Sequence, residues 1–211
     1  MIMPWLHAVT PECESLLECV QIASDIHPYV DAIHVRQKQW TARRIWNAVE
    51  QYREAGIPQH KLIVNDRVDV AAAANLRGVQ LAYHSLPPYA VRAAFPQLLM
   101  GVSVHDEREA RQAERQGADY VIYGHVFSTA SKPGREPKGE EGLKRCRQAL
   151  AIPIVAIGGI SCDNIGQVIA AGASGVAVMS GIWHDERPAL SARRYRESLM
   201  EAVHGPSMLR S

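Results

Sequence analysis

The sequence predicts an α/β protein built as a single (β/α)8 barrel, because three observations agree. Short apolar runs rich in β-branched residues recur along the chain, and eight can be counted. Segments with helical periodicity separate most of these runs, so strands alternate with helices throughout. Several runs are apolar at consecutive positions, as in IPIVAIGG and GVAVMSG, which is typical of parallel strands buried on both faces. A doubly wound open sheet is the alternative that the same pattern allows.

The expected elements follow in chain order. The eight expected strands cover residues 6–9, 32–35, 62–64, 78–81, 99–102, 120–123, 154–157 and 176–179. Segment 41–56 has one apolar face, and segment 106–117 reads as a helix that starts at an N-cap, Asp106, and ends at Gly117. The segment before the fourth strand leaves room only for a short helix. Segment 189–203 fits the eighth helix, with an arginine-rich face toward solvent.

Length and charge limit the classes of function. A chain of 211 residues, 47% apolar, fits one globular domain over residues 1–211, and we expect a disordered tail from about residue 205. A formal net charge of +1 gives no reason to expect nucleic acid or an anionic membrane as a partner. The sequence shows neither a signal peptide nor an apolar run of about 18 residues. We therefore expect a cytoplasmic protein with a small-molecule partner.

Four cysteines are present, and they suggest neither a metal site nor a disulfide scaffold. They form no CxxC pair and are sparse for a chain of this length. We expect reduced thiols at these positions and no metal site. The four are Cys13, Cys19, Cys146 and Cys162.

In a barrel of this kind, functional side chains come from the loops that follow the strands. The loops after the last two expected strands contain small residues: AIGGIS carries Gly158 and Gly159, and VMSGI carries Ser180 and Gly181. Barrels often bind phosphate at these two loops, through backbone N–H groups and helix N-termini. The sequence therefore predicts a phosphate-binding site and a phosphorylated substrate.

The segment after the sixth expected strand is the longest one poor in apolar residues. Residues 128–142 are rich in Gly, Pro and charge, and they lie beside His125. A loop of this length in a compact barrel is usually functional, and closure would exclude water from the site. We predict a lid, with a mobile surface loop as the alternative.

The motifs HVRQK, LIVNDRVDVA, VFSTASK and IPIVAIGGISCDNIGQVIAAGASGVAVMSGI together resemble the thiamin phosphate synthase superfamily, over residues 6–183. The resemblance to the synthase implies that one set of residues holds a pyrophosphate and a pyrimidine. That set is Arg36, Lys38, Asn65, Ser103, Thr129, Ser131 and Lys132. It also implies magnesium bound by Asp66 and by a second acidic residue after the fourth strand. Ser85 stands where that second acid is expected.

A second departure concerns His125, which replaces the proline of the synthase loop in YGHVFSTASKPG. This segment is similar to the thiazole tautomerase, or TenI-type, branch of the superfamily. That resemblance implies an isomerase that aromatises a carboxythiazole phosphate tautomer with no metal and no cofactor. It places the essential histidine at His125, the basic residue at Lys38, and the phosphate loops at Gly158-Gly159 and Met179-Ser180. A homodimer is an expectation only.

Such a tautomerisation removes a proton from the ring carbon that bears the carboxylate and delivers a proton to the exocyclic carbon. An imidazole changes charge near neutral pH, so His125 could do both, and a cation such as Lys38 or Lys132 would stabilise the developing negative charge. The alternative for His125 is a residue at a strand end, bonded to a backbone carbonyl. The alternative for Lys38 is a solvated charge at the barrel rim.

Three functions remain on the sequence alone. The tautomerase is favoured. The alternatives are a thiamin phosphate synthase that joins hydroxymethylpyrimidine pyrophosphate and thiazole phosphate, and a non-catalytic barrel that binds a thiamin-related phosphate. Asp66 and Asn65 have a further interpretation, because either could cap the helix that follows.

Overall fold

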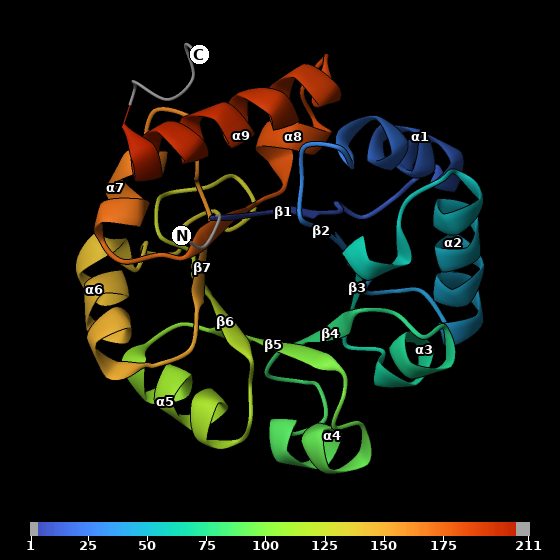
Figure 1. Ribbon diagram of the computed structural model, residues 1–211, viewed down its shortest axis with the longest axis horizontal. Helices are drawn as coiled ribbons and strands as arrows, with labels where there is room; N and C mark the ends of the chain where they lie inside the picture. Colours follow the sequence, from blue (N-terminus) through green and yellow to red (C-terminus); the bar gives the residue numbers. More distant parts are fainter. Residues whose placement is uncertain (1–3, 206–211) are drawn as a thin grey trace.

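In the computed structural model, which describes residues 4–205, the chain forms a closed barrel surrounded by helices (Figure 1). Eight parallel strands pair in chain order, and the last strand, β8, pairs with the first, β1. Closure leaves no sheet edge, so the (β/α)8 prediction is confirmed and the open-sheet alternative is excluded. No helix among residues 4–205 is long and apolar enough to cross a membrane.

The strands are short, and their positions agree closely with those expected. They are β1 (Trp5–Val9), β2 (Ala32–Val35), β3 (Leu62–Asn65), β4 (Gly78–Leu81), β5 (Leu99–Val104), β6 (Tyr120–Gly124), β7 (Ile154–Ile157) and β8 (Gly175–Val178). Strand β5 runs two residues beyond the expected end because Ser103 and Val104 still pair with Ile122 and Tyr123 of β6. The polar Ser103 is therefore part of the sheet rather than of the loop after it.

The helices form the outer layer. They are α1 (Leu16–Ile26), α2 (Ala42–Glu54), η1 (Gln59–Lys61), α3 (Val68–Ala73), α4 (Pro88–Ala94), α5 (Glu107–Arg115), α6 (Gly139–Ala149), α7 (Ile165–Ala170), α8 (Ser180–Trp183) and α9 (Pro188–His204). The N-cap predicted for α5 is confirmed, because the Asp106 carboxylate accepts a hydrogen bond from Glu109 N at 2.8 Å. Helix α3 has six residues, as the short segment before β4 predicts.

The buried side chains fall into two layers. Most of the core lies between the strands and the helices, and a small cluster that includes Val9, Tyr120 and Val155 lies inside the barrel. Two histidines also point into the interior: His34 Nε2 lies 3.0 Å from His7 Nδ1, and both rings are buried. Burial is the main cause that lowers the pKa of His7 to about 3 and the pKa of His34 well below its ordinary value. Both rings are therefore neutral in the folded barrel.

The structure contradicts the expectation that all cysteines are reduced, because Cys13 and Cys19 form a disulfide. The loop after β1 turns into α1 and brings the two Cα atoms to 6.4 Å, within the range that a disulfide needs. Sequence reasoning missed the pair because a spacing of six residues, from a loop into a helix, matches no common cysteine motif. Of the residues described, Cys146 and Cys162 are free.

Reduction of this disulfide is expected to lower the free energy of unfolding by about 2 kcal/mol, from the entropy of closing so short a loop. For a chain of this size, that corresponds to a fall of about 4–8 °C in Tm. Thermal unfolding with and without a phosphine reductant measures the change. The reductant should leave the Tm of the Cys13→Ser/Cys19→Ser variant unchanged. An equal shift in that variant would assign the effect to something other than the disulfide.

Candidate functional site

The residues predicted for the site all lie at one end of the barrel, because every parallel strand points the same way and each residue ends its strand or follows it. Arg36 and Lys38 follow β2, and Asn65 ends β3. The others are Ser103 near the end of β5, His125, Thr129, Ser131 and Lys132 after β6, Gly158 and Gly159 after β7, and Met179 and Ser180 after β8. We call this end the mouth.

Both the backbone and the side chain of Arg36 make contacts that hold it at the mouth. Its N–H donates to Thr10 Oγ1 at 2.9 Å, and its guanidinium lies 3.6 Å from the carboxylate of Glu12. The same carboxylate accepts a hydrogen bond from the backbone N–H of Lys38 at 3.3 Å. Gln37, between the two cations, is buried and donates to the carbonyl of Pro11 at 2.7 Å. The loop after β1 therefore fixes the backbone that carries both cations, and the Lys38 side chain remains exposed.

Ser103 and Asn65 lie beside a buried amide that the sequence did not single out. Gln80, on β4, donates to Ser103 Oγ at 3.0 Å, and its own Oε1 has no hydrogen-bond partner among residues 4–205. The buried Oδ1 of Asn65 also lacks a partner within the described part of the chain. Neither Asn65 nor Asp66 caps α3, whose N-cap is Arg67 with no side-chain hydrogen bond, so the capping alternative is wrong.

His125 is buried, with 4% of its surface exposed, at the start of the loop between β6 and α6. Its Nε2 donates to the carbonyl of Arg135 at 3.2 Å, and its own carbonyl accepts from Lys138 N at 2.8 Å. The backbone and Cβ of His125 pack against Gly158, where any added Cβ would collide with the Cβ of His125. His125 therefore links the start of the loop to residues near its end. This is the alternative given above for His125, a strand-end histidine bonded to a backbone carbonyl.

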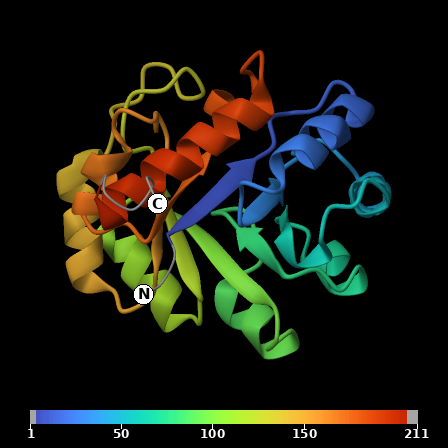
Figure 2. The same ribbon diagram turned by 45° about the horizontal axis from the view of Figure 1, so that its top comes forward.

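The loop from 125 to 138 projects beyond the mouth (Figure 2), and hydrogen bonds form turns within it. Lys132 N donates to Thr129 O at 3.1 Å, and Ser131 N to Thr129 Oγ1 at 3.3 Å. The predicted lid is shorter than expected, because residues 139–142 belong to α6. That the loop closes over a ligand stays a prediction.

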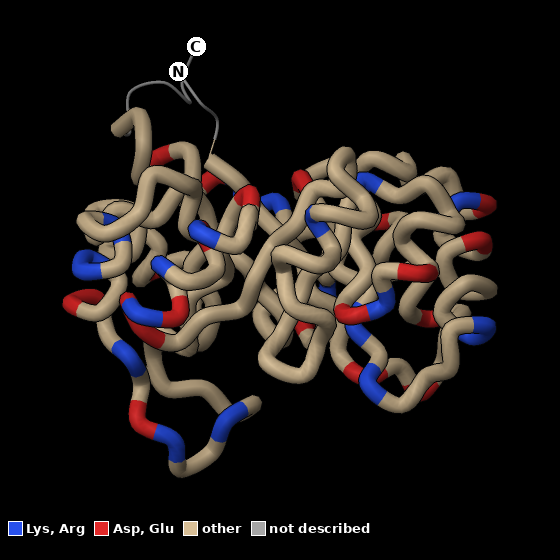
Figure 3. Tube along the Cα trace, turned by 90° about the horizontal axis from the view of Figure 1, so that it is seen from below, with Lys and Arg blue, Asp and Glu red and all other residues tan. Residues whose placement is uncertain are grey.

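Lys132 is the half-buried cation of this loop. Burial lowers its pKa, and the nearby charges of Arg135, Lys138 and Arg36 act in the same direction. Lys132 and Arg36 therefore belong to one positive region, although they are far apart in the sequence and follow different strands, β6 and β2. In the loop that projects at the lower left of Figure 3, basic segments outnumber the acidic one, which is Glu136 in the sequence.

The two glycine-rich loops bring unpaired backbone donors to the mouth. Gly158 and Gly159 have φ values of 100° and 66°, which only glycine adopts readily, and a Cβ on Gly159 would come within 2.5 Å of Ser128 O. The N–H groups of Gly159 and Ser180 make no hydrogen bond to any residue in 4–205. Free amides at the same end of the barrel as Lys132 and Arg36 are suited to a phosphate or pyrophosphate group. The role of each residue stays a prediction.

Sequence reasoning missed three residues that shape the site: Thr10, Glu12 and Gln80. Thr10 and Glu12 follow β1, and the strand-end rule applied to the other seven strands would have found them. Gln80 is inside a strand, so only the register of the barrel reveals that it faces Ser103.

Comparison with known proteins decides the family. A family model described as thiamine monophosphate synthase matches residues 6–182. The chain belongs to the thiamine monophosphate synthase family. Among its relatives, a thiamine-phosphate synthase from Moorella thermoacetica is 43% identical over 81% of this chain and 83% of its own length. One from Chlorobium luteolum is 38% identical over 90% of both chains.

Solved structures agree with this membership. Thiamine phosphate pyrophosphorylase from Pyrococcus furiosus superposes with a TM-score of 0.80 at 30% identity, covering 95% of this chain and 98% of that one. A 3-hexulose-6-phosphate synthase superposes with a TM-score of 0.72 at 18% identity, over 92% of this chain and 99% of that one. At so low an identity, the second match shows a shared fold alone.

These relatives correct the function favoured from the sequence. Synthases are transferases, so the prediction of an isomerase that acts as a thiazole tautomerase is wrong. The prediction gave most weight to two positions, His125 and Ser85. In the structure, His125 ties a loop together, and relatives over most of the chain carry the synthase name. Membership in the superfamily and a role in thiamine biosynthesis are confirmed.

Proposed function

We propose that this chain is a thiamine-phosphate synthase, which joins hydroxymethylpyrimidine pyrophosphate to thiazole phosphate. The observation that carries the proposal is the identity of 35–43% with proteins of that name over most of the chain. In this reaction, the bond between the pyrimidine's carbon and pyrophosphate breaks, a bond to the thiazole forms, and pyrophosphate leaves.

The geometry of the mouth supports this chemistry, because both substrates are anions. Lys132 and Arg36 form one positive region, suited to the charge that grows on a departing pyrophosphate. The free amides of Gly159 and Ser180 are suited to the phosphate of the second substrate. Ser103, near the end of β5, accepts a hydrogen bond from Gln80 and presents a hydroxyl at the mouth. The loop that carries Lys132 would exclude water from the reacting carbon.

The residues present do not build the pair of carboxylates that the resemblance implies for magnesium. Asp66 is one carboxylate at the mouth, but Ser85 occupies the second position, and its Oγ accepts a hydrogen bond from Ala82 N at 2.9 Å. Residues 4–205 contain no cluster of three or more His, Cys, Asp or Glu that could hold a metal ion. We therefore assign the work of charge stabilisation to Lys132 and Arg36 and derive no step through magnesium.

The assay that tests the proposal mixes the protein with hydroxymethylpyrimidine pyrophosphate and thiazole phosphate, with magnesium chloride in excess over pyrophosphate. Thiamine phosphate is then measured as its fluorescent oxidation product, and pyrophosphate by a coupled assay. We expect the two products in equal amounts. Release of pyrophosphate without thiamine phosphate, or no turnover by protein that is folded by circular dichroism, would contradict the proposal.

Three further predictions go with this proposal. They are a cytoplasmic location, a homodimer and thiazole phosphate as one bound ligand. The last of them is supported by the names of the family and of its relatives, which are synthases of a small phosphorylated molecule.

A further inference from the structure

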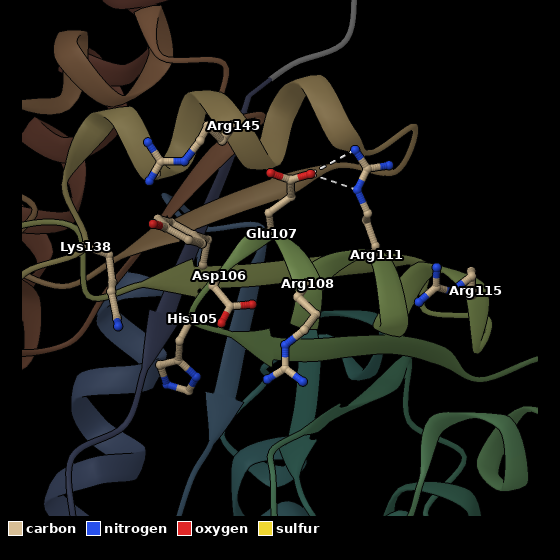
Figure 4. A pocket seen from close by; sticks show the side chains of 10 residues that line it. His105, Asp106, Glu107, Arg108, Arg111, Arg115, Lys138 and Arg145 are labelled. Carbon is tan, nitrogen blue, oxygen red and sulfur yellow. Dashed lines mark hydrogen bonds and ion pairs between the residues drawn. The ribbon is translucent and has the colours of Figure 1, made fainter.

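A cavity of about 600 Å³ lies outside the barrel, between α5 and α6. It is separate from the barrel interior, since its floor is Tyr123, which belongs to the layer between strands and helices; Lys138, at one end of it, belongs to the loop that also carries Lys132. Figure 4 shows arginines following one another along α5, with Arg145 on α6 across from them and Lys138 at one end. We call this cavity the α5–α6 groove. Its volume is that of a small-molecule site.

The groove concentrates positive charge. Five cationic side chains line it, against two carboxylates, Asp106 and Glu107, whereas the whole chain has a formal net charge of only +1. Glu107 pairs with Arg111 at 2.9 Å, drawn as dashed lines in Figure 4. The other four cations make no ion pair with any residue in 4–205: they are Arg108, Arg115, Lys138 and Arg145. An anionic ligand would offset this unbalanced charge.

Tyr123 supplies a hydrogen-bond donor at the floor of the groove. Its side chain is 1% exposed, yet its hydroxyl forms no hydrogen bond within the described chain. Gly142 lies directly against the hydroxyl, and any side chain there would cover it. Burial raises the pKa of Tyr123 to about 12, so the phenol stays protonated and can donate. The hydroxyl is not among the fully buried polar atoms that lack a partner in residues 4–205, so it reaches the groove and can donate to an acceptor bound there.

The spacing of the arginines indicates an elongated anion. Residues 108, 111 and 115 follow the three- and four-residue spacing that places side chains on one helix face. They span a helical rise of about 10 Å, longer than one phosphate group. Every one of these side chains, and Tyr123, is a donor, and the planar guanidinium matches phosphate oxygens in pairs. Eight of the ten lining residues, those labelled in Figure 4, carry a charged group or an imidazole, so the groove is suited to a polar ligand.

We propose that the α5–α6 groove binds an oligophosphate anion, a ligand with two or more linked phosphates, separately from the mouth. Arg108, Arg115 and Arg145 contact the terminal phosphates, and the Tyr123 hydroxyl donates to an oxygen at the floor. The proposal does not depend on the reaction catalysed at the mouth.

Isothermal titration calorimetry with inorganic triphosphate tests the proposal, in a Lys132→Ala background that weakens anion binding at the mouth. Arg108→Glu/Arg145→Glu is expected to raise Kd by about a hundredfold or more, because charged hydrogen bonds are lost and repulsion is added. Tyr123→Phe keeps the charge and is expected to raise Kd by about fivefold to tenfold through the loss of one donor. Arg194→Glu, an exposed arginine on α9, is the matched control and should bind as the background does.

Three outcomes would overturn the proposal. The first is an unchanged Kd in the double variant, which would leave the mouth as the binding site. The second is an equal loss in Arg194→Glu, which would show a response to overall charge. The third is binding of hexaglutamate but not of triphosphate, which would assign the groove to an acidic peptide. All substituted arginines are exposed, so circular dichroism should show each charge variant folded.

Discussion

Lys132→Ala is expected to lower kcat/KM for thiamine phosphate formation by about 100-fold to 1,000-fold, the range seen when one preorganised donor to developing negative charge is removed. Burial lowers the pKa of this lysine, and the charges of Arg135, Lys138 and Arg36 act in the same direction. Such crowding is unfavourable without an anion and becomes favourable when pyrophosphate occupies the space. The charge on pyrophosphate grows as its bond to carbon breaks, so we expect kcat to fall more than KM rises.

Two variants make this measurement specific. Lys144→Ala removes an exposed lysine of α6 that pairs with Glu141, and it should keep kcat/KM within about twofold of the wild type. Lys132→Arg keeps the positive charge but places it on a planar guanidinium, and we expect this variant to recover part of the lost rate. If steady-state assays of folded Lys132→Ala show the wild-type kcat, the assignment of Lys132 to the leaving group is wrong.

The barrel could be predicted from the sequence because its strands are buried on both faces. Runs such as IPIVAIGG are apolar at consecutive positions and end at glycine, so both their type and their limits are visible in the chain. Strand β5 shows where this fails: its last two residues look like loop, yet pairing with β6 keeps them in the sheet. The order of the strands then fixes the mouth, and with it the position of every candidate residue.

The roles of the site residues were harder to predict, because they depend on contacts between distant segments. Glu12 and Arg36 meet only when the loop after β1 folds over β2, and the carbonyl that binds His125 comes from ten residues further along. His125 matched a family motif, but a sequence motif does not show whether the imidazole faces a substrate at the mouth or hydrogen-bonds to the backbone of its own loop. The function assigned from that pattern was therefore the part that failed.

The second large effect concerns acid, and it comes from the barrel interior. In the unfolded chain, a histidine takes up a proton below about pH 6.5. In the folded barrel, burial lowers the pKa of His7 to about 3, with Arg77 and Arg196 acting in the same direction, and it lowers that of His34 well below normal. The unfolded state therefore binds more protons as the pH falls. Stability is complete above about pH 6.5 and is lost progressively toward the folded-state values.

We expect the free energy of unfolding to fall by about 2.5 kcal/mol between pH 7 and pH 5.5, the sum for two histidines that stay neutral when folded. Most carboxylates keep their charge over this interval, so the two rings dominate the change. Urea unfolding at several pH values measures it. His34→Gln should roughly halve the fall, because one ring that titrates only on unfolding is gone, whereas His60→Gln, at an exposed position, should keep the full fall. Wild-type stability that is flat over this range, or a full fall in His34→Gln, would show that the interior histidines do not control acid unfolding.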